Sequence, residues 1–187
     1  MKGNRAAVVA VLVIVAVVFS WFVMKRAGRA EPIDLLSDAR WAPAKKQPAP
    51  DLFKVTDATL GSESRRAIAI DPTAGTTRLT WRVTVPDDAW LDVAVGLDPA
   101  AWEKEGNGVL FRFGVSDGRT YEEMFSQHMD PFVNKGDRKW VPVMVDLSAY
   151  AGEEVDLIFG SNPSPQDKPE NRDNDLALWG SPRVVIR

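Results

Sequence analysis

The chain has 187 residues, with 26 acidic and 23 basic side chains, no cysteine and a single histidine. The lack of cysteine excludes disulfides, thiolate zinc sites and cysteine nucleophiles, and one histidine excludes a two-histidine metal site. The five charges within residues 1–29 are all positive, so the remainder has 18 basic and 26 acidic residues, a net charge of −8. This acidic domain is not expected to bind nucleic acid, because phosphate neutralisation needs a basic face.

Residues 6–24 form a run of nineteen residues without a charge. As a helix rising about 1.5 Å per residue, the run would cover about 28 Å, close to the thickness of the hydrocarbon core of a bilayer. The apolar region of a cleaved signal peptide is shorter, at about 7–15 residues. A buried core helix would show polar residues at a helical period, whereas Ser20 is the one polar residue in this run. Residues 1–29 are therefore predicted to form a transmembrane signal anchor.

Basic residues flank both ends of the predicted span, so the positive-inside rule leaves its orientation nearly balanced. We expect the N-terminus in the cytoplasm, because a short polar head before a single span is the usual form of an uncleaved signal anchor. The expected location is a bacterial inner membrane, with a single pass and a periplasmic C-terminal domain. Trp21 and Phe22 are expected at the membrane interface, where aromatic side chains gather.

Residues 30–51 are expected to form a juxtamembrane linker. Pro43, Pro48 and Pro50 favour an extended course with few backbone donors, which is typical of a stiff spacer. Residues 31–41 fit a short amphipathic helical turn, with Trp41 resting on the membrane or on a neighbouring subunit. A loosely ordered loop is the alternative for this stretch.

Residues 52–187 follow a period of two with polar breaks, as in antiparallel sheets with one buried face. The alternating apolar rows are Leu79, Trp81, Val83 and Val85; Leu91, Val93 and Val95; Val109, Phe111, Phe113 and Val115; Val141, Val143, Val145 and Leu147; and Val155, Leu157 and Phe159. Residues 65–70, 121–128 and 177–186 supply further strands. Two short helical turns are expected at 99–104 and 148–152, the second capped by Ser148 and ended by Gly152. The prediction is one all-β domain over residues 52–187, a β-sandwich or jelly roll.

The closing third of the chain resembles the galactose-binding-domain-like jelly rolls, the fold of many carbohydrate-binding modules. The residues that carry the resemblance are Trp140, Val145, Asp146, Leu147, Ser148, Tyr150, Ala151, Gly152, Val155, Leu157, Phe159, Asn174, Asp175, Ala177, Trp179, Gly180 and Pro182. The resemblance implies a fold, and such folds carry many functions. It also implies a structural calcium ion, which jelly rolls of this class often bind.

The sequence offers one weak calcium site and no other cofactor site. Residues 161–177 hold several oxygen ligands close together, the candidates being Asp167, Glu170, Asp173 and Asp175. Their spacing matches no EF-hand loop, so a long polar hairpin loop is the favoured interpretation, and a loop that docks a partner is a third.

The residue patterns do not predict an enzyme. Ser126 and His128 are two residues apart on one strand face, and no G-x-S-x-G elbow accompanies them. Glu122 and Glu123 fall on opposite faces of the same strand, so they do not form an acid–base couple. We therefore expect binding rather than catalysis.

Seven tryptophans are more than a core of this size needs, so some are expected in an interface. The candidate interaction residues are Trp21, Phe22, Trp41, Trp90, Trp102, Tyr121 and Phe125. Trp90 and Trp140 are candidates for exposed aromatic residues, because they fall out of phase with the apolar rows beside them.

Two functional hypotheses remain. In the first, the protein is a non-catalytic accessory subunit that stabilises a larger bacterial membrane complex, by analogy a photosynthetic reaction centre with its antenna or another bioenergetic complex. Its partners are then the membrane and the other subunits. In the second, the protein is a membrane-tethered carbohydrate-binding module that binds envelope glycans through exposed aromatic side chains.

Deleting residues 1–29 should release a soluble, folded domain, because the predicted membrane anchor is removed with them. Fractionation at high salt and circular dichroism check this expectation. A deletion product still found wholly in membranes would contradict a single-span anchor.

Overall fold

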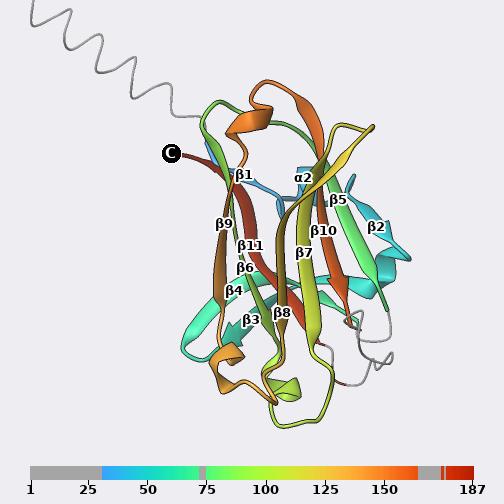
Figure 1. Ribbon diagram of the computed structural model, residues 1–187, viewed down its shortest axis with the longest axis vertical. Coiled ribbons are helices and arrows are strands. Elements are labelled where there is room, and N and C mark those ends of the chain that lie inside the picture. Colours follow the sequence, from blue (N-terminus) through green and yellow to red (C-terminus); the bar gives the residue numbers. More distant parts are fainter. Residues whose placement is uncertain (1–30, 72–74, 164–173, 175) are drawn as a thin grey trace, which may run out of the picture.

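Two antiparallel sheets pack face to face (Figure 1). The structure, a computed structural model, describes residues 31–71, 75–163, 174 and 176–187. Within these ranges no helix is long and apolar enough to cross a membrane, and the span expected at residues 6–24 lies outside them.

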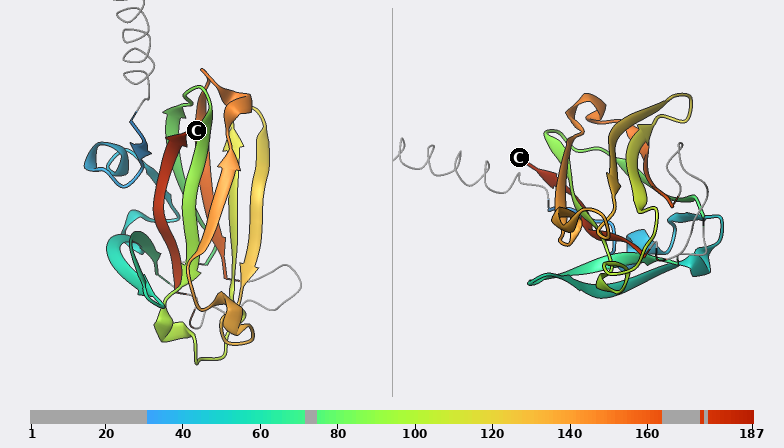
Figure 2. Two further views of the ribbon diagram at one scale, coloured as in Figure 1. Left: turned by 90° about the vertical axis from the view of Figure 1, so that its left-hand side faces the viewer. Right: turned by 60° about the horizontal axis from the view of Figure 1, so that its bottom comes forward.

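The first sheet has six strands in the order β3-β4-β11-β6-β9, with β1 also paired to β11. Its strands are β1 (Ile33–Asp34), β3 (Phe53–Leu60), β4 (Glu63–Ile70), β6 (Ala89–Leu97), β9 (Val141–Asp146) and β11 (Ala177–Ile186). The left panel of Figure 2 shows β11, β6 and β9 side by side, with the β3–β4 hairpin next to them.

The second sheet has five strands in the order β2-β5-β10-β7-β8. Its strands are β2 (Lys45–Gln47), β5 (Thr77–Thr84), β7 (Val109–Ser116), β8 (Tyr121–Met129) and β10 (Glu154–Asn162). The connections contain helix α2 (Asp38–Trp41) and the 3-10 turns η1 (Pro50–Leu52), η3 (Pro99–Ala101), η4 (Lys135–Asp137) and η5 (Ser148–Tyr150).

The predicted apolar rows fill the space between the sheets. Every residue of the five rows is buried except Val141, which is partly buried. On β5, for example, Leu79 and Trp81 face the core while Arg78 and Arg82 are exposed. The all-β sandwich predicted from the alternation is thus confirmed.

The stretch expected to be a spacer is part of the sandwich, which corrects the domain boundary placed at residue 52. Leu35 and Leu36 are fully buried in the main core, and β1 pairs with β11. Further along, β2 pairs with the edge of β5. The prolines of this stretch flank β2 and do not interrupt it: Pro43 precedes the strand, and Pro48 and Pro50 follow it. Proline is tolerated there, because it removes no hydrogen-bond donor from the paired part of the strand. Apolar burial and edge pairing therefore outweigh the spacer-like composition.

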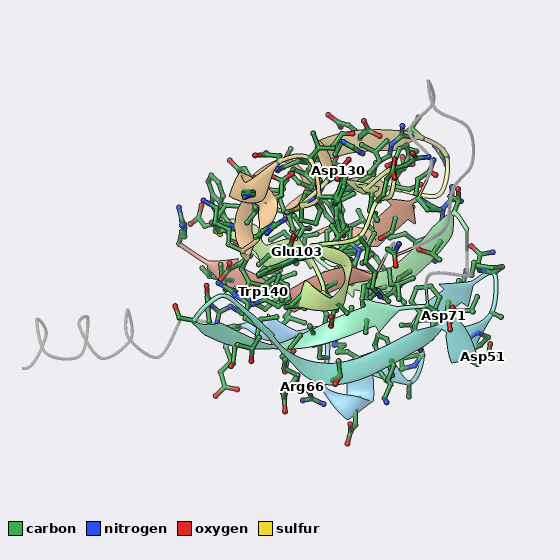
Figure 3. The ribbon with its side chains drawn as sticks, turned by 90° about the horizontal axis from the view of Figure 1, so that it is seen from below. Asp51, Arg66, Asp71, Glu103, Asp130 and Trp140 are labelled. Atoms are coloured by element: carbon green, nitrogen blue, oxygen red, sulfur yellow. The ribbon has the colours of Figure 1, made fainter. Side chains whose placement is uncertain are left out.

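The outer face of the six-stranded sheet carries a second, smaller core. Ala94 and Leu178 face away from the main core and pack with Trp140, which is buried. The β3–β4 hairpin covers this cluster, and Trp140 Nε1 donates a hydrogen bond to the Glu63 carbonyl oxygen at 3.0 Å. Figure 3 shows Trp140 on the inner side of the hairpin and Arg66 on its outer side. The out-of-phase tryptophan is therefore a core residue.

The predicted turn at residues 148–152 is a 3-10 turn, but its cap differs from the prediction. Leu147 is the N-cap residue and Ser148 is the first residue of the turn, with its backbone N–H donating a hydrogen bond to Asp146 Oδ1 at 2.9 Å. Gly152 ends the turn with a φ of 78°, a conformation that favours glycine. The turn predicted at 99–104 is also a 3-10 turn, over Pro99–Ala101.

Replacing Gly180 by alanine should destabilise the fold. The added methyl group would lie 2.8 Å from Cζ3 of Trp140 and 3.0 Å from Cδ of Arg65, closer than carbon atoms pack. We expect urea denaturation to show a loss of about 1–3 kcal/mol in unfolding free energy, as for other overpacked sites. Gly160→Ala on β10 is the matched control, because its methyl group meets no atom within 3.7 Å. Equal stability of the two variants would contradict this packing.

The unfolding free energy should fall in acid. Hydrogen bonds from Ser148 lower the pKa of Asp146, and a hydrogen bond from Arg82 lowers the pKa of Asp156. The stabilisation from such carboxylates is fully present above the unfolded-state pKa of about 3.9 and is lost as the pH falls through the folded-state value. Asp156→Asn should therefore reduce the loss of stability between neutral and acid pH. An unchanged pH profile for this variant would show that the Arg82–Asp156 pair contributes nothing.

Candidate functional site

A cleft of about 440 Å³ lies on the outer face of the five-stranded sheet. Its volume is within the range of about 300–1,000 Å³ found for small-molecule sites. Four neighbouring strands, β5, β10, β7 and β8, supply its main side chains. Its lining includes Arg78, Leu110, Arg112, Tyr121, Ile158 and Gly160.

Arg78, Gly160 and Arg112 form one row across three of these strands. Gly160 of β10 pairs with Arg78 of β5 on one side and with Arg112 of β7 on the other. Directly paired residues project to the same face of a sheet, so the two arginines flank a position that has no side chain. The atom nearest to a Cβ built at Gly160 is the Thr77 carbonyl oxygen, 3.7 Å away. Gly160 therefore forms an open floor between two guanidinium groups.

Tyr121 supplies an aromatic ring on the β8 side of the cleft. The residue is 51% exposed, and its ring packs over Gly114 of β7, where any Cβ would collide with it. Burial raises the pKa of the Tyr121 phenol; Glu123 acts in the same direction, while Arg112 and Arg78 oppose it. Both guanidinium groups of the row are therefore near enough to the phenol to influence its charge.

The arginines of the row are held less firmly by carboxylates than a third arginine on this face. Arg82 donates two hydrogen bonds to Asp156, from Nε at 2.8 Å and from Nη2 at 2.9 Å. Arg112 Nε lies 3.5 Å from Glu123 Oε2 and makes no hydrogen bond within the described chain. Arg78 has no acidic partner among the residues that the structure describes. The cleft is therefore a basic surface on an acidic domain.

The predicted interaction residues do not gather at one place. Tyr121 lines the cleft. Trp41 is half-buried, with its ring centroid 6.2 Å from that of Trp81. The guanidinium of Arg187 lies over the ring of Trp90, 5.1 Å from its centroid.

Two further aromatic candidates, Trp102 and Phe125, also lie away from the cleft. Trp102 Nε1 donates a hydrogen bond to the Leu97 carbonyl oxygen at 2.9 Å, and Phe125 packs partly buried against the main core. Trp21 and Phe22 lie outside the described residues. The interface proposed for these seven residues as a group stays a prediction.

Sequence reasoning misses the two arginines and the glycine of the row. The signal was present in the alternation, because Arg78 precedes the buried Leu79 and Arg112 lies between two buried phenylalanines. Both positions therefore had to point outward. What the sequence does not show is the register that brings both arginines to Gly160.

The predicted Ser126–His128 pair and the calcium candidates do not form a second site among the described residues. Ser126 and His128 share the outer face of β8, as predicted, and His128 Nε2 lies 2.7 Å from the Asn107 carbonyl oxygen. The calcium candidates Asp167, Glu170, Asp173 and Asp175 lie outside the described residues. Within the part of the chain that is described, no group of three potential metal ligands comes together.

Comparisons with known proteins identify the fold and no family. No protein-family profile matches the sequence. An uncharacterised protein of Archaeoglobus fulgidus is 39% identical over 105 residues, which is 54% of this chain and 25% of that protein. The chain therefore spans about a quarter of the length of that relative.

Several similar solved structures are carbohydrate-binding modules with a galactose-binding-like β-sandwich. A Clostridium perfringens ZmpB structure, which holds an M60 catalytic domain with the CBM51-1 and CBM51-2 domains, matches 76% of this chain and 13% of its own at 17% identity and a TM-score of 0.50. The CBM51 of Clostridium perfringens GH95, in complex with methyl-galactose, matches 76% of this chain and 87% of its own at 16% identity and a TM-score of 0.49. The resemblance of residues 140–182 to this fold is confirmed at the level of the fold alone.

Proposed function

We propose that this domain is a carbohydrate-binding module that holds a glycan in the cleft on the outer face of the five-stranded sheet. The observation that carries the proposal is the exposed ring of Tyr121, held against Gly114 at the edge of the cleft. The fold shared with carbohydrate-binding modules supports it.

The cleft has the mixture of surfaces that a sugar needs. A sugar ring has C–H faces that pack on an aromatic or aliphatic surface and hydroxyl groups that need hydrogen-bond partners. Tyr121, Leu110 and Ile158 provide the apolar surface. Arg78 and Arg112 provide donors fixed in a planar fork.

The same groups favour binding over hydrolysis. Glycoside hydrolysis usually needs two carboxyl groups on either side of the scissile bond, and the described lining of the cleft contains none. Arginine stays protonated at all accessible pH values, and burial raises the pKa of Tyr121 further above neutrality. The described lining therefore offers no group that exchanges a proton near pH 7.

The two hypotheses from the sequence now differ in their support. The accessory-subunit hypothesis receives none from the fold or from the comparisons. The glycan-binding hypothesis has the cleft and the fold in its favour. A tether formed by residues 6–24, which would present the cleft to envelope glycans, is a separate proposal that the deletion of residues 1–29 tests.

Replacing Tyr121 by alanine should weaken glycan binding by about tenfold or more, corresponding to about 1.4 kcal/mol. The expected cause is loss of the ring on which the sugar packs, and the effect on stability should be small because the residue is half exposed. The measurement is a glycan array with the 187-residue chain in mild detergent, followed by calorimetry with the best ligand.

Phe132→Ala is the matched control, because Phe132 is also an exposed aromatic residue, at 42%, and lies outside the cleft. The control variant should bind like the unmodified chain. The proposal is wrong if no glycan binds, or if both aromatic variants bind as tightly as the unmodified chain.

A further inference from the structure

On the outer face of β5 and β10, two arginines of β5 each lie directly opposite a residue of β10, and the two opposing residues differ. Arg82 is directly opposite Asp156, whose carboxylate it binds through Nε and Nη2. Four residues earlier on the same strand and face, Arg78 is directly opposite Gly160. The carboxylate that neutralises an arginine at one end of the strand pair is therefore replaced by empty space at the other.

From this difference we infer that the cleft selects glycans that contain a hexuronic acid, with the sugar carboxylate over Gly160 between Arg78 and Arg112. This inference rests on the proposed function and names its substrate class. The carboxylate takes the place relative to Arg78 that the Asp156 side chain takes relative to Arg82. Arginine suits this role because its planar fork matches the two oxygens of a carboxylate.

The second arginine strengthens the site from the opposite side. Neighbouring strands lie about 4.8 Å apart, so Arg78 and Arg112 start about 10 Å apart with the glycine midway. An arginine side chain is long enough to reach a group above Gly160 from either strand. In the structure Arg112 Nε lies beside Glu123 of β8, so Arg112 turns toward β10 when it binds the carboxylate. Arg112 is only weakly engaged by Glu123, at 3.5 Å and without a hydrogen bond, so it retains donors for a ligand.

The electrostatics of the domain make this cluster unusual. Residues 30–187 carry a net charge of −8, which repels an acidic glycan from most of the surface. Two arginines around one open position provide the local exception. Tyr121 lines the same cleft as both arginines, so a sugar packed on its ring lies in the cleft that the two guanidinium groups line.

The experiment compares uronic acid oligosaccharides with their carboxyl-reduced counterparts. Oligomers of galacturonic, glucuronic, mannuronic and guluronic acid are each titrated into the 187-residue chain by calorimetry, together with the same oligomers after reduction of the carboxyl group to a hydroxymethyl group. In at least one pair the acid should bind tenfold or more tightly, with a preference that shrinks as salt is added.

Three variants locate the effect. Arg78→Gln should remove the preference for the acid, because it weakens binding of the acid by a larger factor than binding of the reduced oligomer. Arg82→Gln removes the same charge from the same face of β5 and should leave the preference intact. Gly160→Asp should abolish binding of the acid, because the new side chain occupies the place of the ligand carboxylate.

The outcomes separate this inference from the proposed function. Equal binding of acid and reduced oligomers, both lost in Tyr121→Ala, would overturn the uronic acid assignment and leave the glycan-binding function standing. Tighter binding of a sulfated or phosphorylated sugar than of any uronic acid would also overturn the carboxylate assignment. No binding of any oligomer, acidic or neutral, would overturn both.

Discussion

The contacts of Phe159 between the two sheets fix the arrangement on which the rest of the structure depends. Its ring lies 5.0–5.1 Å, centroid to centroid, from those of Trp81, Phe113 and Trp179, each in an edge-on arrangement. These neighbours come from three other strands of both sheets, so the phenylalanine cannot turn outward without opening the core. Because side chains alternate along a strand, an inward Phe159 fixes an outward Gly160. The main core thereby determines the floor of the cleft.

The distribution of the smaller core explains why the candidate site is on one sheet and not on the other. On the six-stranded sheet, the β3–β4 hairpin and Trp140 cover part of the outer face, and Gly180 allows Trp140 to approach β11 closely. On the five-stranded sheet, strands β5, β10, β7 and β8 keep an outward face lined by arginine and tyrosine side chains and by Gly160. Glycine has opposite roles in the two places: Gly180 makes room for a side chain of the protein, and Gly160 leaves room that no side chain fills.

Sequence alone predicts the strands of this fold that bury their apolar side chains in a single core. The rows from Leu79 to Phe159 alternate without a break, and their inward positions were identified correctly. Strand β3 was not singled out, because it buries Phe53 in the main core and Leu60 in the second, so its apolar phase changes along the strand. The site was harder to predict than the fold: Tyr121 was identified as an exposed aromatic residue, but its proximity to Arg78 and Arg112 depends on cross-strand register, which no local pattern records.

The proposed ligand surface is the outer face of the five-stranded sheet. The most direct measurement follows the arginine Nε–H and backbone amide resonances by nuclear magnetic resonance while a binding glycan is added. The account predicts that the largest shift changes occur at Arg78, Arg112 and Gly160, with little change at Arg183, which Asp92 holds on the other sheet. Shift changes confined to the second core around Trp140, or to the turns around η3 and η4, would contradict the account.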